Sequence, residues 1–172
     1  MQDDNLVITD SPEWQECKQL WLRALQTDQA AFSSVYADNL NYPDTKWQER
    51  LDASKNRKGS RALYARVDGK LVGMIGALWE DKVTTNHWAT VFGMYVDPEY
   101  RCRQIGQKLI AALETDLKSN KNFRKLKLGV NAEQLAAVKL YTKMGFTSIG
   151  VYNEDLHVGD KFYDVIIMEK YL

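Results

Sequence analysis

The sequence predicts one α+β domain over residues 1–172, with a mostly antiparallel sheet flanked by helices. Three observations predict this class. Apolar residues recur at helical spacing through the first third of the chain, and from Ser60 they recur at every second position, as in strands. A strand, a helix, a strand and a helix then follow, and the chain closes on two further strands. The length suits a single domain with a buried core.

The first third of the chain is predicted to form a short strand and three helices. Residues 5–9 are a β-type run. The sequence SPE at residues 11–13 supplies a cap residue, a first-turn proline and an early acid, which together mark a helix start. Apolar residues at helical spacing continue from there to about residue 26. Two more helices are predicted over residues 32–40 and 45–56, separated by a break at the sequence NYPD.

The middle of the chain predicts a hairpin. The runs ALYARV and LVGMIGALW, residues 62–67 and 71–79, flank the dipeptide DG, which is favoured in tight hairpin turns. A third strand of this group is predicted over residues 86–96. The remaining elements are a helix at about 104–119, a strand at 125–130, a helix at 133–144, and strands at 146–154 and 161–168. Gly145 is a natural stop for the last helix.

Composition and charge exclude several classes of protein. Lys plus Arg number 23 and Asp plus Glu number 23, so the formal net charge is zero, and we expect no nucleic-acid partner. Cys17 and Cys102 lie far apart, which supports neither a disulfide framework nor a zinc site, so we expect no metal. The N-terminus lacks the apolar run of a signal peptide, and no stretch has the length of a membrane span. A cytoplasmic protein without membrane contact is therefore expected.

The sequence RCRQIGQ, residues 101–107, indicates an anion site at a helix start. Backbone N–H groups there are unpaired, and the helix dipole adds partial positive charge. Such groups come from Cys102 through Gln107, and Gly106 allows a phosphate or pyrophosphate to approach closely. The alternative is an ordinary helix start decorated with two solvated arginines, and the turn alone modestly favours that alternative.

Two motifs in order carry a resemblance to a known family. The sequence VDPEYRCRQIGQKL, residues 96–109, is followed after a strand by VNAEQLAAVKLYTKMGF, residues 130–146. Together they closely resemble the signature motifs of the GNAT superfamily of N-acetyltransferases, and GDKFYDVIIM, residues 159–168, is similar to that family's closing strand. The resemblance covers residues 60–172 well, while the N-terminal helices agree in kind without a signature. It implies the GNAT fold, in which the twisted central sheet is splayed.

Three residues depart from the family pattern. Gln104 stands where the first motif has glycine, and Cys102 stands where glycine is frequent. N–H donation is expected to persist at both, provided that the backbone is helical or bridging there. Gln134 replaces the more usual asparagine of the second motif, which keeps an amide but lengthens it. With these departures, cofactor binding weaker than is usual in the family is one of the outcomes that the sequence allows.

The resemblance implies acetyl-coenzyme A as the cofactor. In this family the strands before and after the turn, here 90–96 and 125–130, splay apart and leave backbone groups unpaired. The pantetheine arm would add to the exposed edge as a strand does, with the N–H group of Met94 as oxyanion stabiliser. The implied cofactor-binding residues are Met94, Tyr95, Val96, Arg101, Cys102, Arg103, Gln104, Ile105, Gly106, Gln107, Gln134 and Tyr141.

The resemblance also implies catalytic roles. Tyr141 lies where the family has its general acid, which protonates the departing thiolate; a packed helix tyrosine is the alternative. The glutamate that the family often carries on the preceding strand is replaced by Thr90. Glu80 and His87 are the candidate bases, directly or through water, since carboxylate and imidazole groups accept protons. For each alone, ordinary surface polarity is the simpler interpretation, and an amine of lowered pKa or an ordered water chain is a further option.

The acceptor is the least determined part of the prediction. Several acids could attract a cationic amine, namely Asp38, Asp44, Glu80, Glu154 and Asp155. The leading hypothesis is acetyl transfer to the primary amine of a small molecule. The others are acetylation of a protein N-terminus or lysine, and a non-catalytic module that binds coenzyme A thioesters. Paired subunits are common among such relatives, so a homodimer is a state that the resemblance allows.

Overall fold

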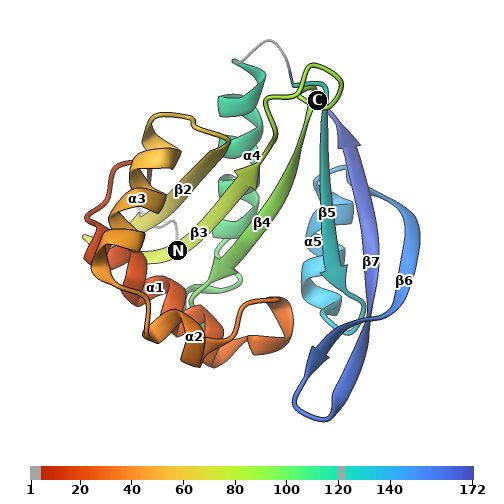
Figure 1. Ribbon diagram of the computed structural model, residues 1–172, viewed down its shortest axis with the longest axis horizontal. Helices are drawn as coiled ribbons and strands as arrows, with labels where there is room; N and C mark the ends of the chain where they lie inside the picture. Colours follow the sequence, from red (N-terminus) through yellow and green to blue (C-terminus); the bar gives the residue numbers. More distant parts are fainter. Residues whose placement is uncertain (1–4, 120–122) are drawn as a thin grey trace.

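A seven-stranded sheet forms the centre of the protein (Figure 1). The computed structural model describes residues 5–119 and 123–172. Residues 1–4, which are part of the N-terminus in which no signal peptide was expected, lie outside the described residues. The strands are β1 (Val7–Thr9), β2 (Ser60–Val67), β3 (Lys70–Leu78), β4 (Trp88–Val96), β5 (Lys125–Asn131), β6 (Thr147–Val158) and β7 (Lys161–Tyr171). Their order in the sheet is β1-β2-β3-β4-β5-β7-β6, and neighbours are antiparallel except for the parallel pair β4 and β5.

Helices cover both faces of this sheet (Figure 1). They are α1 (Trp14–Thr27), the 3₁₀ turn η1 (Gln29–Ala31), α2 (Tyr36–Leu40), α3 (Asp44–Lys55), the 3₁₀ turn η2 (Pro98–Tyr100), α4 (Ile105–Lys118) and α5 (Leu135–Lys143). One buried cluster packs α4 and α5 against the central strands, and a second packs α1 and α3 against the opposite face. The predicted α+β class with a mostly antiparallel sheet is therefore confirmed.

The element bounds confirm the order of the prediction and correct some of its details. The DG turn of the β2–β3 hairpin has positive φ at both residues, as a tight turn requires. The predicted cap of the first helix is wrong, because α1 begins at Trp14 with Glu13 as its N-cap, and the Glu13 N–H donates to the Glu16 carboxylate at 3.2 Å. The helix predicted over 32–40 is regular only from Tyr36.

The sheet opens between β4 and β5. These strands pair at only three positions, from Trp88 opposite Lys125 to Thr90 opposite Lys127. Beyond them β4 stays paired with β3 as far as Val96, and β5 stays paired with β7 as far as Asn131. Figure 1 shows the two strands diverging from that closed end. Within the described residues, the facing edges of the two strands thus have no strand partner beyond Thr90, which confirms the predicted splay.

Candidate active site

The turn before α4 has an unusual backbone. Cys102 has φ of 63° and Gln104, the N-cap of α4, has φ of 62°, so both adopt the left-handed conformation. The helical or bridging backbone on which the predicted N–H donation was conditional is therefore not found at these two residues. Arg103, between them, is not among the positive-φ residues. A left-handed residue next to a right-handed one turns successive N–H groups toward a common concave side, which is a backbone cradle for anions.

Ion pairs tie this turn to the end of α1. Arg101 donates from Nε to the Val96 carbonyl at 2.9 Å and pairs with the carboxylate of Asp28, the C-cap of α1. The Arg23 guanidinium of α1 lies 3.0 Å from the fully buried carboxylate of Asp97. The Arg101 side chain is thus engaged within the protein, and the backbone N–H groups are what the turn offers to an anion.

Gly106 joins the turn to two other elements. A Cβ at this position would lie 2.8 Å from Met94 Cε on β4 and 3.0 Å from Leu140 Cδ2 on α5. Ile105 beside it is buried in the core. The anion turn, the open strand and the helix that carries Tyr141 therefore meet at Gly106.

A β-bulge shapes β4 at the opening. Met74 of β3 pairs with Tyr95 and Gly76 pairs with Phe92, so β4 has one extra residue in this stretch. Gly93 lies in the bulge with φ of 63°, and a Cβ there would lie 2.9 Å from the Trp21 ring. Only glycine fits both the backbone conformation and this contact.

The three strand residues predicted to meet the cofactor differ in where their side chains lie. Tyr95 is 3% exposed, and its hydroxyl lies 3.1 Å from Thr27 Oγ1, so this side chain packs under α1. Met94 lines a cavity and contacts the core beside α4. Val96 is half-buried and its carbonyl accepts the Arg101 bond. Of Tyr95, therefore, the backbone groups but not the side chain are available at the opening.

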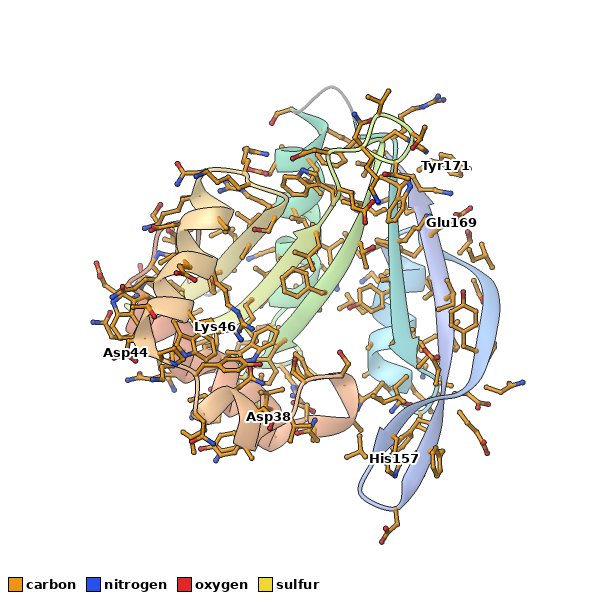
Figure 2. The ribbon with its side chains drawn as sticks, viewed as in Figure 1. Asp38, Asp44, Lys46, His157, Glu169 and Tyr171 are labelled. Carbon is orange, nitrogen blue, oxygen red and sulfur yellow. The ribbon has the colours of Figure 1, made fainter. Side chains whose placement is uncertain are left out.

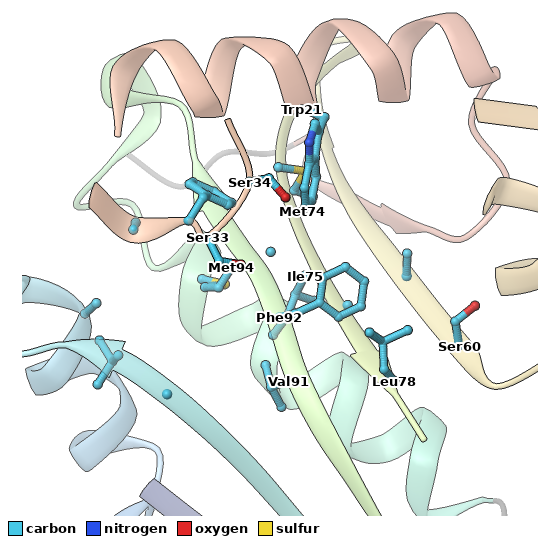
Figure 3. Close-up of a pocket in the computed structure, with 18 of the residues that line it drawn as sticks. Trp21, Ser33, Ser34, Ser60, Met74, Ile75, Leu78, Val91, Phe92 and Met94 are labelled. Carbon is cyan, nitrogen blue, oxygen red and sulfur yellow. The ribbon is translucent and has the colours of Figure 1, made fainter. Parts of the chain in front are cut away.

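The cavity has a volume of about 680 Å³ and runs from α3 across β3 and β4 to β5, α5 and β6. Figure 3 shows part of its lining, with Trp21 from α1 and with Phe92 and Met94 from β4. Gln134 and Tyr141 line it from the α5 side. The structure thus brings together three of the predicted residues, Met94, Gln134 and Tyr141, in one cavity.

Tyr141 is a buried phenol. Its ring packs edge-on against Phe146 at 5.7 Å, and burial raises the pKa of its hydroxyl well above the ordinary value. Within the described residues its hydroxyl has no hydrogen-bond partner. Such a group is protonated at neutral pH, which suits a proton donor.

Glu80 and His87 lie away from this cavity. Leu78 and Thr90 pair at the closed end of the splay, and Glu80 lies beyond that end, where its carboxylate pairs with Lys82 at 3.1 Å. His87 is exposed and immediately precedes β4. At ~3.3 Å per strand residue, it lies roughly 20 Å from Met94. Neither residue lines the cavity, so the structure does not bring the two candidate bases to Tyr141.

The predicted acids separate in the same way. Figure 2 shows Asp38 and Asp44 among the N-terminal helices. The label of His157 in the same view marks the β6–β7 hairpin, whose strand β6 also carries Glu154 and Asp155. Asp44 pairs with Lys18 at 2.9 Å. Of the five acids in the prediction, Asp155 alone lines the cavity.

Asn131 is a structural residue of the site that the sequence prediction missed. It ends β5, is 5% exposed and lines the cavity. Its Nδ2 donates to the Ala30 carbonyl at 2.9 Å, and its Oδ1 accepts from the Glu133 N–H at 2.9 Å. The amide therefore fastens the segment after α1 to the edge of the splay. The signal in the sequence was a polar amide directly after an apolar strand.

Neither a metal cluster nor a membrane-spanning helix occurs within the described residues. They contain no group of three or more His, Cys, Asp or Glu side chains that could hold a metal ion. None of their helices combines the length and apolar character needed to span a membrane.

Comparison with known proteins gives concordant results. The family model described as "Acetyltransferase (GNAT) family" matches residues 14–146. The chain is 30% identical over 115 residues to the L-amino acid N-acetyltransferase AaaT of Escherichia coli K12, covering 65% of this chain and 68% of that relative. It is also 30% identical over 122 residues to the [ribosomal protein bS18]-alanine N-acetyltransferase of Escherichia coli K12, covering 71% of this chain and 78% of that relative.

Solved structures share the fold. A GNAT-family acetyltransferase from Streptococcus pneumoniae superposes with a TM-score of 0.85 at 21% identity, covering 98% of this chain and all of that chain (100%). The structure of yncA, a putative acetyltransferase from Salmonella typhimurium with its cofactor acetyl-CoA, gives a TM-score of 0.81 at 16% identity, covering 98% and 94% of the two chains.

Proposed function

The chain belongs to the acetyltransferase (GNAT) family, whose cofactor is acetyl-coenzyme A, and on that premise we propose that it acetylates the primary amine of a small molecule. The observation that carries the proposal is that Met94, Gln134 and Tyr141 line the same cavity. Gly106 contacts Met94 and so connects this cavity to the anion turn. The 30% identity to a relative named an L-amino acid N-acetyltransferase supports a small acceptor.

The turn and the open strand edge fit the two parts of the cofactor that carry polar groups. Backbone N–H groups of residues 102–107 would bind the pyrophosphate, because the alternating left-handed residues and the start of α4 both direct N–H groups outward. Backbone groups of residues 94–96 would pair with the pantetheine arm along the unpaired edge of β4. When bound there, the cofactor supplies an acetyl thioester beside Met94.

Two groups of the chain would then act on the reacting atoms. The N–H of Met94 donates to the carbonyl oxygen on which negative charge develops, and a donor fixed in a bulge needs no reorganisation to do so. Tyr141 donates its hydroxyl proton to the sulfur as the carbon–sulfur bond breaks. Burial raises the pKa of this hydroxyl, so the group holds its proton at neutral pH until the reaction takes it.

A protein N-terminus is the second candidate acceptor. The specific observation in its favour is the 30% identity, over 78% of that relative, to the alanine N-acetyltransferase of ribosomal protein bS18. The cavity runs from α3 to β6, so an acceptor longer than a single amino acid has room to extend along it.

A screen of acceptors tests the proposal. The purified protein is incubated with acetyl-coenzyme A and, in turn, L-methionine, L-phenylalanine, phenethylamine, spermidine and a short peptide with an N-terminal alanine. Free coenzyme A is measured by chromatography, because the exposed thiol of Cys102 would react with a thiol reagent. Amine-dependent release with a small molecule supports the proposal, release with the peptide alone favours the second candidate, and release with none contradicts both.

A further inference from the structure

Strand β6 contains a β-bulge opposite Asp164. Tyr152 pairs with Val165 and Leu156 pairs with Tyr163, so residues 153–155 face the single residue Asp164. Within this bulge Glu154 has φ of 53°. A bulge of this kind breaks the regular alternation of a strand and re-aims its side chains.

Asp164 fixes this bulge against the site. Its carboxylate accepts from the Glu154 N–H at 2.9 Å, and its backbone carbonyl accepts from the Ala132 N–H at 2.9 Å. Ala132 follows β5 in the short connection to α5 (Leu135–Lys143), the helix of Tyr141. The bulge is therefore fastened to the segment that also positions Gln134 and Tyr141.

Asp155 extends from this bulge to the cavity, and it is the one carboxylate among the described residues that line it. Within the described residues its side chain makes no hydrogen bond or ion pair. The cavity-lining Arg61, by contrast, is engaged by Asp10 and Asp116, each at 2.8 Å. Arg50 also lines the cavity, and its guanidinium stacks on the Tyr42 and Trp47 rings, each at 5.1 Å. Asp155 thus presents to this largely apolar cavity a carboxylate that no described side chain pairs with.

We propose that Asp155 receives the ammonium group of the acceptor and takes the proton that this group must lose before attack, an inference that rests on the proposed function. A primary amine is an ammonium ion at neutral pH, and an unpaired carboxylate both attracts it and accepts its proton. Asp155 lines the cavity, which Glu80 and His87 do not, and in this proposal it supplies the base.

The proton count of the reaction closes with this assignment. A carbon–nitrogen bond forms and the carbon–sulfur bond of the thioester breaks. The first proton of the ammonium passes to Asp155 and, because this residue is exposed, from there to solvent. Tyr141 gives its proton to the sulfur, and the second proton lost by the nitrogen restores the tyrosine hydroxyl. The acceptor class is accordingly a cationic primary amine.

The variant Asp155→Asn tests the assignment, with Asp160→Asn as the matched control. Asp160 is an exposed aspartate in the turn between β6 and β7 and does not line the cavity. With the best amine of the screen, we expect Asp155→Asn to lower kcat/KM for the amine by about 10²-fold, which is the ordinary contribution of general-base catalysis. The KM for acetyl-coenzyme A should stay within about twofold of wild type, since a residue that meets only the acceptor adds nothing to cofactor binding.

Two further measurements distinguish the loss of a positioned base from a general disturbance of the fold. Asp155→Glu should recover part of the lost rate, because it returns a carboxylate, and Asp160→Asn should match the wild type. Calorimetric titration of each variant with the same amine, in the presence of coenzyme A, measures acceptor binding without turnover.

The outcomes distinguish this inference from the function on which it rests. Equal kcat/KM and equal amine affinity in wild type and Asp155→Asn would overturn the role of Asp155 and leave the acetyltransferase proposal standing. A wild-type protein that binds an amine through Asp155 but forms no coenzyme A would overturn the proposed reaction and retain the amine site. A wild type that neither binds nor acetylates any amine of the screen would overturn both.

Discussion

Met94 on β4 and Gly106 in the first turn of α4 are in such close contact that a Cβ on Gly106 would lie 2.8 Å from Met94 Cε. This contact sets the distance between the anion turn and the strand edge at which the thioester would lie. Because the cofactor must reach both, the geometry of the site depends on the absence of a side chain at Gly106.

Gly106→Ala should therefore weaken cofactor binding. The added methyl group must displace Met94 and Leu140, and overpacking of this kind costs about 1 to 3 kcal/mol of stability. We expect a lower affinity for acetyl-coenzyme A in calorimetric titration together with this loss. Gly150→Ala is the control, because a Cβ there meets nothing within 4 Å. An unchanged affinity in Gly106→Ala would show that the contact does not set the site.

Gln104→Gly should stabilise the protein and leave the affinity for coenzyme A equal or higher. A left-handed residue other than glycine carries a cost of roughly 1 to 2 kcal/mol, which glycine avoids. Gln107→Gly, inside α4, should instead destabilise by about 1 kcal/mol because of the low helix propensity of glycine. Urea unfolding measures both changes. A large loss of coenzyme A affinity in Gln104→Gly would mean that the glutamine side chain is itself a ligand.

Tyr141→Phe should lower kcat by about 10²-fold or more, the usual contribution of a general acid, while the dissociation constant of acetyl-coenzyme A changes little. Stability should be nearly unchanged, since the hydroxyl has no hydrogen-bond partner within the described residues. Tyr152→Phe serves as the control, because Tyr152 is 59% exposed. Turnover equal to wild type in Tyr141→Phe would remove this residue from the acid role.

The ion pair of Glu16 with Arg66 should make stability depend on pH. The two hydrogen bonds from Arg66, at 2.8 and 2.7 Å, lower the pKa of the Glu16 carboxyl below its ordinary value of 4.5. A lowered pKa contributes stability above the ordinary value, and this contribution is lost as the pH falls through the lowered pKa.

Glu16→Gln should accordingly destabilise the protein at pH 7, by about 0.5 to 1 kcal/mol for a half-buried pair close to the surface. The difference from wild type should shrink steadily below the ordinary pKa of glutamate. Urea unfolding of both proteins from pH 7 to pH 3 measures it, with Glu49→Gln on the exposed face of α3 as the control. A difference that stays constant over this range would contradict the assignment.

The sequence predicted those parts of the site that are contiguous in the chain. The turn at residues 101–107 and the helix of Tyr141 each follow from a local motif, and both occur at the predicted positions. The positive φ of Gln104 did not follow, because a side chain other than glycine argues locally against that conformation.

Features that depend on strand pairing escaped prediction. Glu80 and His87 flank the strands that form the site, but the pairing of Thr90 with Lys127 puts them beyond the closed end. Asp155 was one of five equivalent acids in the sequence. Its position in the cavity depends on the bulge opposite Asp164, which only the register between β6 and β7 reveals.

The central claim, that the turn before α4 binds acetyl-coenzyme A, is tested most directly by alkylation of Cys102. This thiol is exposed in the turn, whereas burial raises the pKa of the Cys17 thiol to about 11, so Cys17 should stay unmodified and serve as the internal control. The rate of iodoacetamide labelling at each cysteine is measured by mass spectrometry, with and without millimolar acetyl-coenzyme A. We predict strong protection of Cys102 by the cofactor. Labelling at the same rate in both conditions would contradict the claim.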